Sequence, residues 1–214
     1  MIRAHAILVA IASAGLAISA PAAADDHVST GDYPLDDILA AFATACSGVE
    51  DPAVNRASVE AAGWELYEPD ADSIMGRLIT FGRAAIENEE LEDGETPTEI
   101  LDNGVFRRTI SGRSLHIVLS GARIDEIRTT GCRLYDFEAT AEPDAETLSS
   151  WARRAPEAVS RPSDGLVAYK WNGGLKPGHL DMEIFFAAPD AELPMNIPIS
   201  GLTLSASNLE IEGL

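Results

Sequence analysis

The stretch VFRRTISGRSLHIVLS, residues 105–120, decides the fold class. Apolar and polar residues alternate along most of it with a period of two, which is typical of a strand with one buried face. Ser111 and Gly112 interrupt the alternation, and a glycine between two such runs favours a tight turn. The stretch therefore predicts an antiparallel hairpin with strands over residues 105–110 and 113–120.

More strand patterns follow this hairpin along the chain. We expect a third strand over residues 131–139 and a second hairpin over residues 166–187, with its turn at 172–174. Between them, Asp144 can cap a helix that must end before Pro156. Pro194 and Pro198 make the next segment an edge strand or a loop, and residues 202–206 favour a final short strand.

Helical patterns precede the first hairpin. Pro34 fits the first position of a helix whose apolar residues recur every three to four positions and which ends at Gly48. Asp51 and Pro52 begin a second helix, which Gly63 ends. Two short helices joined by a few residues predict an antiparallel pair.

Residues 65–103 are harder to assign. A short strand fits residues 64–67. The residues after it fit either a helix capped by Asp72 or Ser73 or, instead, a strand over residues 77–81. The acidic tract 87–95 then offers carboxylates for a divalent cation. Its spacing does not match the D-x-D-x-D-G calcium loop, so a solvated helix end and loop is the alternative.

These elements together predict an α+β fold. We expect a mainly antiparallel sheet of about five to six strands, with the N-terminal αα pair and a further helix packed on it. The two cysteines, Cys46 and Cys132, predict one disulfide, because an even count in an oxidising compartment indicates a bond, and two separate buried thiols are the alternative. This bond would join the first helix to the third strand.

Residues 1–24 have the pattern of a signal peptide, with Arg3, an apolar run over residues 7–18 and an alanine triplet at the cleavage site. We expect a flexible segment over 25–33 and a single domain over 34–214. The location would be the periplasm or the exterior of a Gram-negative-type bacterium. No stretch reaches the ~20 apolar residues of a spanning helix, so we expect no membrane insertion after cleavage.

The cysteine and glycine pattern also resembles that of a group of small secreted bacterial proteins with no assigned activity. The resemblance covers most of the expected mature chain and is carried by Phe42 and Cys46, by Ala61-Ala62-Gly63-Trp64, and by Gly131-Cys132. These are structural residues, so the resemblance implies no catalytic residue.

Charge sets further bounds on function. The chain has 35 acidic and 15 basic residues and a formal net charge of −20, which argues against nucleic-acid binding. Residues 104–134 are an exception with a net charge of +4, between segments 25–103 at −17 and 135–214 at −8. All bases of this positive segment are arginines, whose planar fork suits a carboxylate or a phosphate. Pairing with the protein's own carboxylates is the alternative.

The candidate residues for an anion or a partner are Arg107, Arg113, Arg133 and His116. Strand alternation directs His116 away from Leu115, so it is either a general base or an ordinary half-buried strand residue. The three arginines share one face of the sheet if the strands keep the expected phase.

We expect a non-catalytic binding protein whose acidic surface favours a basic protein partner, as in an inhibitor or immunity-type protein. A small anionic ligand at the arginines is the other expected partner. The alternatives are a small envelope hydrolase that uses His116 or His179 with a carboxylate, and cation binding by the tract 87–95. No nucleotide-binding, zinc-protease or serine-hydrolase motif occurs. We therefore expect no cofactor and no metal, assign no catalytic residue, and expect a monomer or a homodimer.

Overall fold

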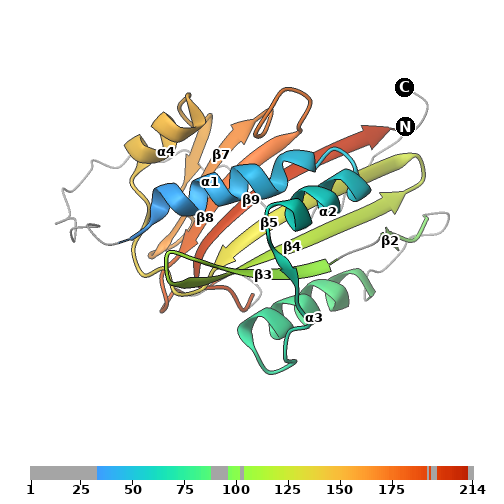
Figure 1. Ribbon diagram of the computed structural model, residues 1–214, viewed down its shortest axis with the longest axis horizontal. Helices are drawn as coiled ribbons and strands as arrows, with labels where there is room; N and C mark the ends of the chain where they lie inside the picture. Colours follow the sequence, from blue (N-terminus) through green and yellow to red (C-terminus); the bar gives the residue numbers. More distant parts are fainter. Residues whose placement is uncertain (1–32, 88–95, 102–103, 192, 194–196, 212–214) are drawn as a thin grey trace.

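A computed structural model describes residues 33–87, 96–101, 104–191, 193 and 197–211. These residues form one sheet of nine strands, which helices cover (Figure 1). The strands are β1 (Glu65–Leu66), β2 (Glu99–Ile100), β3 (Gly104–Ile110), β4 (Arg113–Ile124), β5 (Ile127–Asp136), β6 (Ala158–Ser160), β7 (Leu166–Asn172), β8 (Asp181–Ala187) and β9 (Gly201–Ile211).

The strand order is β1-β3-β4-β5-β9-β8-β7-β6, with β2 paired to β4, and each of these pairs is antiparallel. The predicted α+β class is confirmed, but the predicted count of five to six strands is wrong. The short strand β1 lies within the strand expected over residues 64–67, whereas β2 and β6 were not expected, because two or three residues are too few for an alternating pattern to show. The last strand, β9, is also longer than expected and lies in the middle of the sheet, between β5 and β8.

The helices are α1 (Leu35–Ala45), the short 3-10 helix η1 (Cys46–Gly48), α2 (Pro52–Ala61), α3 (Ile74–Glu87) and α4 (Ala145–Ala152). Asp51 and Asp144 cap α2 and α4 as expected, because their carboxylates accept backbone N–H groups of the first turn. Ser73 accepts from the Gly76 amide at 3.0 Å and so supports the start of α3. The helical interpretation of this segment is therefore confirmed, and the strand over residues 77–81 is wrong.

The core lies between the sheet and the pair α1 and α2, which cross one face of it (Figure 1). The residues of β4 that alternate toward these helices, Leu115, Ile117 and Leu119, are at most 4% exposed. They face Leu39 and Phe42 of α1 in the same core cluster, both fully buried. Complete burial of one such side chain contributes about 1.5–3 kcal/mol.

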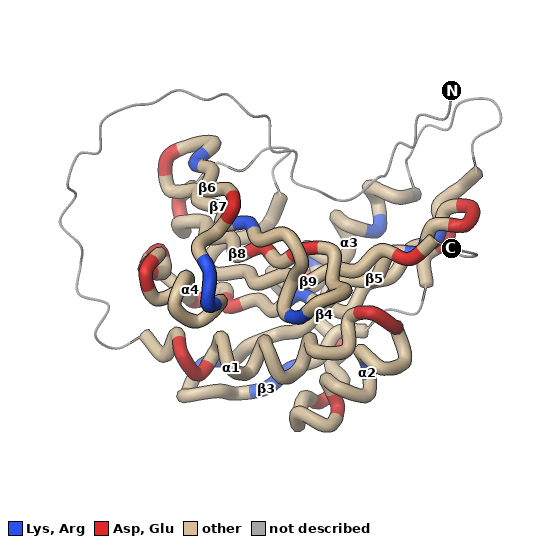
Figure 2. Tube along the Cα trace, turned by 90° about the horizontal axis from the view of Figure 1, so that it is seen from above, with Lys and Arg blue, Asp and Glu red and all other residues tan. Residues whose placement is uncertain are grey.

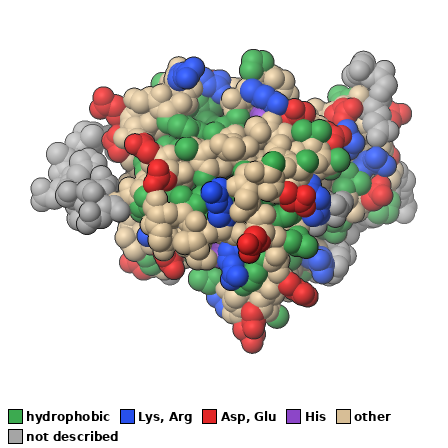
Figure 3. All heavy atoms as spheres, viewed as in Figure 1, with side chains coloured by type: hydrophobic (Ala, Val, Ile, Leu, Met, Phe, Trp, Pro, Cys, Tyr) green, Lys and Arg blue, Asp and Glu red, His purple; other side chains and the backbone are tan. Residues whose placement is uncertain are grey.

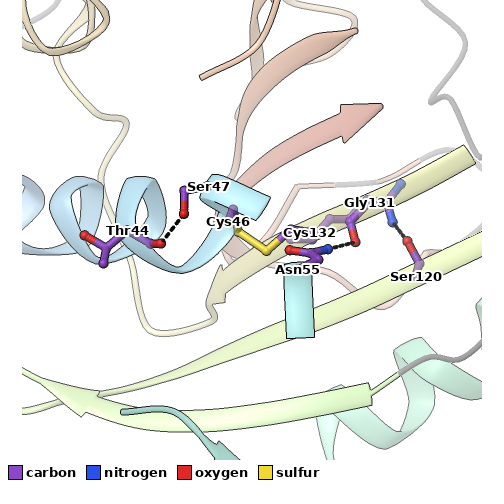
Figure 4. Close-up of a disulfide and its surroundings, with 8 residues drawn as sticks. Thr44, Cys46, Ser47, Asn55, Ser120, Gly131 and Cys132 are labelled. Atoms are coloured by element: carbon purple, nitrogen blue, oxygen red, sulfur yellow. Dashed lines mark hydrogen bonds between the residues drawn. A yellow bond between two sulfur atoms is a disulfide. The ribbon is translucent and has the colours of Figure 1, made fainter. Parts of the chain in front are cut away.

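The predicted disulfide is confirmed, and it joins η1 to β5 (Figure 4). Cys46 and Cys132 are fully buried, with their Cα atoms 5.5 Å apart. Beside the bond, the Asn55 amide of α2 donates to the Gly131 carbonyl at 3.4 Å, and the Thr130 hydroxyl donates to the Val49 carbonyl. A disulfide of this kind fits an extracellular or periplasmic protein.

No helix within the described part of the chain is long and apolar enough to cross a membrane.

Candidate functional site

The two faces of the sheet differ in character. The face toward α1 and α2 is apolar and buried. The opposite face, which we call the back face, has α3 on its side (Figure 2). Strand alternation makes the middle of this face polar. Its polar side chains come from six neighbouring strands and include Arg107, His116, Ser120, Arg133, Ser205, Glu183 and Lys170.

Three of the four candidate residues meet on the back face. Arg107 of β3 lies directly opposite His116 of β4, and His116 lies opposite Tyr135 of β5. Residues opposite one another point to the same face, and so do residues two apart along a strand, which adds Arg133 to this group. We call Arg107, His116 and Arg133 the back-face site.

Arg113 does not join them. It is three positions from His116 along β4, so strand alternation directs its side chain to the helical face. There its Nε donates to Asp136 Oδ2 at 2.6 Å and its Nη2 donates to Oδ1 at 2.9 Å. Asp136 is fully buried and also accepts the Tyr33 hydroxyl at 2.7 Å. Arg113 therefore neutralises a buried carboxylate beneath the start of α1.

The imidazole of His116 is half-buried among aromatic rings. Its centroid lies 5.5 Å from that of Tyr67 and 5.8 Å from that of Phe137, which in turn stacks on Tyr135 at 5.6 Å. Its Nδ1 is buried and has no hydrogen-bond partner in the described part of the chain. Burial, and then the charge of Arg107, lower the pKa of His116. The imidazole is therefore neutral at pH 7 and keeps one nitrogen open to a hydrogen-bond partner.

An aromatic ring and a hydroxyl, rather than carboxylates of the described residues, contact the guanidinium groups of the back-face site. Arg107 lies over the ring of Tyr67, 4.5 Å from the centroid. Arg133 donates from Nη1 to the Ser120 hydroxyl at 2.9 Å, and it lies beside Gly131, where a Cβ would come within 3.4 Å of Nη1 and 2.7 Å of Ser120 Oγ. Of the carboxylates that the structure describes, none lies within 4.0 Å of either guanidinium.

The other arginines of the positive segment behave differently. Arg108 donates to the backbone carbonyl of Ala62. Three more form ion pairs with the protein's own carboxylates: Arg113 with Asp136, Arg123 with Glu99, and Arg128 with Glu210. Among the described residues, ion pairs with the protein's own carboxylates therefore account for half of the six arginines and do not include the two of the back-face site.

His179 has a carboxylate neighbour but is inaccessible. Its Nε2 lies 3.3 Å from Glu50 Oε2, and its side chain is 1% exposed. Asp181 is not its partner, because that carboxylate accepts the Ser207 hydroxyl and lies 3.3 Å from the Lys170 ammonium. A substrate cannot touch this imidazole unless the loop between β7 and β8 opens.

The acidic tract predicted as a possible cation site begins at Glu87, the last residue of α3, and its remaining residues 88–95 lie outside the described chain. Across the residues that are described, no group of three or more His, Cys, Asp or Glu side chains is placed to hold a metal ion. Cation binding by the tract stays a prediction.

Several side chains around the back-face site were not expected from the sequence: Tyr67, Ser120, Tyr135 and Phe137. Alternation places Tyr135 and Phe137 on the side of Arg133, and Ser120 on the side of His116, so a signal for these three was present. Tyr67 could not be placed, because its position depends on the two-residue pairing of β1 with β3.

Comparison with models of protein families, with curated proteins and with solved structures found no match. The resemblance to small secreted bacterial proteins stays a prediction. The function must be inferred from the geometry of the chain itself.

Proposed function

We propose that the protein is a non-catalytic binding protein of the periplasm or the exterior, and that it binds a small anion at the back-face site. One observation carries the proposal: among the residues that the structure describes in this acidic chain, no carboxylate pairs with the guanidinium group of Arg107 or Arg133. Arginine presents paired N–H donors that match carboxylate, phosphate and sulfate oxygens. An anion there would supply the charge that the protein's own surface does not.

The surroundings support binding of an anion more than hydrolysis. His116 has no carboxylate partner among the described residues to orient it as a general base, and His179 is buried. The two arginines come from strands held on both sides by neighbours, so their backbones are fixed before a ligand arrives. Such pre-organisation lowers the entropy cost of binding.

Calorimetric titration of the oxidised protein with sulfate at pH 7 and constant ionic strength tests the proposal. Arg107→Gln and Arg133→Gln should each weaken binding at least about tenfold, because a hydrogen bond to a charged group contributes roughly 1.5–3 kcal/mol. Arg108→Gln is the matched control, since Arg108 is on the same strand and points to the opposite face. Equal sulfate binding by all four proteins would contradict the proposal.

A basic protein partner is a second candidate, and a specific region favours it. Acidic side chains gather at the end of the molecule where α4 lies (Figure 3). Two adjoining cavities of about 590 and 300 Å³ lie between α1 and α4 and share Asp36, Asp144 and Thr147. Asp36 and Glu146 make no hydrogen bond or ion pair with the described residues, so their charges face solvent. A lysine or arginine side chain of a partner fits this end of the molecule by charge.

Capture of partners from envelope extract with the oxidised protein tests the second candidate. A basic protein should bind in stoichiometric amount and dissociate as the salt concentration rises, because salt screens surface charges. The double variant Asp36→Asn/Glu146→Gln should lose it, whereas Arg107→Gln should retain it. Retention of the partner by the double variant would exclude this end as the docking surface.

A further inference from the structure

The back-face site contains a titratable group between its two fixed charges, and this gives it a property beyond anion binding. We propose that the site takes up a proton together with its anion, that His116 receives this proton, and that anion affinity therefore rises as the pH falls. The inference rests on the proposed anion site and adds its regulation. The ligand class is an oxyanion, a carboxylate or a phosphate.

The register places His116 where it must respond to a bound anion. It lies directly opposite Arg107 on β3 and diagonal to Arg133 on β5, and cross-strand neighbours at these positions are about 4.5–8 Å apart. An anion held by the N–H fork of Arg107 therefore comes within reach of the imidazole. A protonated imidazole carries a donor on both ring nitrogens, so His116 can then donate to the anion.

Several titratable or charged groups face His116 from the neighbouring strands. They are Arg107 on β3, Arg133 and Tyr135 on β5, and Tyr67 and Glu65 at β1, where Glu65 lies opposite Arg107. Glu65 is the one carboxylate in this set, and it is exposed. Burial and the Arg107 charge lower the pKa of His116, so the free protein leaves it unprotonated near neutral pH.

A bound anion reverses this balance. It neutralises the field of Arg107 and adds a negative charge beside the ring, and an opposite charge within about 4–6 Å favours the charged form and so raises the pKa of a histidine. The complex then binds more protons than the free protein. By linkage, the dissociation constant falls as the pH falls between the pKa of His116 in the complex and its pKa in the free protein. A rise of one unit corresponds to a tenfold gain in affinity at low pH.

The test uses the oxidised full chain after signal removal and sulfate, which keeps its charge over the whole pH range used. Titration calorimetry between pH 8.5 and 5.5 at constant ionic strength should show about a tenfold or larger gain in sulfate affinity. Repetition in buffers of different ionisation enthalpy should show net proton uptake. The NMR titration of the His116 ring should move to higher pH when sulfate is present.

His116→Asn separates this inference from the proposed function, because asparagine cannot titrate. The sulfate affinity of the variant, whatever its value at pH 8.5, should stay nearly constant down to pH 5.5, and the variant should show no net proton uptake on binding. His179→Asn, a change on the other side of the sheet, should keep the wild-type pH dependence.

Each other outcome is decisive. Sulfate binding without proton uptake overturns the inference and leaves the anion site standing. A pH dependence that persists in His116→Asn also overturns it, since another group then titrates. Failure of the wild type to bind sulfate at any pH overturns both the inference and the proposed function.

Discussion

Loss of the disulfide should remove a large share of the stability of this domain. The bond joins cysteines 86 residues apart, and closure of such a loop restricts the unfolded chain. In the chain-entropy model this loop corresponds to roughly 4 to 5 kcal/mol at 25 °C. The double variant Cys46→Ala/Cys132→Ala should lose about this amount of unfolding free energy. Alanine is the suitable replacement, because both sites are fully buried and serine would leave a hydroxyl there without a partner.

Urea unfolding at pH 7, followed by tryptophan fluorescence, measures the loss. The wild type in reductant is the matched control, since it breaks the same bond and keeps both side chains, so the two should agree within about 1 kcal/mol. The single variant Cys46→Ser should also melt at a lower temperature and leave Cys132 reactive to alkylation on unfolding. A loss below about 1 kcal/mol, or two reactive thiols in the untreated native protein, would refute the reasoning.

Three further predictions follow from single contacts. Arg113→Met should cost about 3–5 kcal/mol of unfolding free energy in a urea titration, because it leaves the buried Asp136 without its arginine partner. A cost near zero would contradict this reasoning. Gly201→Ala should destabilise the protein far more than Gly112→Ala. Both glycines have positive φ, but only at Gly201 would a Cβ meet a backbone oxygen, at 2.1 Å. Equal melting temperatures of the two variants would contradict this reasoning. Burial lowers the pKa of His179 below 6.5. As the pH falls, His179 therefore binds a proton in the unfolded chain before it does so in the folded chain, and the free energy of unfolding should fall below about pH 6.5. In His179→Asn, the urea unfolding midpoint should decrease less between pH 7.5 and 5.5 than in the wild type. A wild-type midpoint that increases toward pH 5.5 would contradict the prediction.

Sequence patterns predicted the long elements of this fold and missed two of the short strands, for a physical reason. Alternation over residues 105–120 was sufficient for β3 and β4, because each buries one face against α1 and α2. The short strand β1 was expected near residues 64–67, but β2 and β6 have no such signal, since two or three residues fit many conformations. The central position of β9 in the sheet could not be predicted either, because it depends on pairing with β5 across more than sixty residues of chain.

The candidate site was partly predictable in the same way. A two-residue turn at Ser111 and Gly112 pairs Ile110 with Arg113, and counting back along this register places Arg107 opposite His116. The same count places Arg113 on the other face, so the hairpin sequence already implied that Arg113 lies apart from Arg107. The carboxylate that binds Arg113 could not be foreseen, because Asp136 reaches it through the pairing of β4 with β5.

The strand β5 explains why the two arginines should contribute unequally to binding. Cys132 points from β5 into the helical layer, where the disulfide fixes it, and its neighbours Gly131 and Arg133 point to the back face. Pairing with β4 on one side and β9 on the other fixes this strand further, and Ser120 orients the half-buried Arg133 side chain. Arg107 is exposed on β3, whose outer side pairs, within the described chain, with the short strand β1. The more ordered arginine loses less entropy when an anion binds, so Arg133→Gln should weaken sulfate binding more than Arg107→Gln.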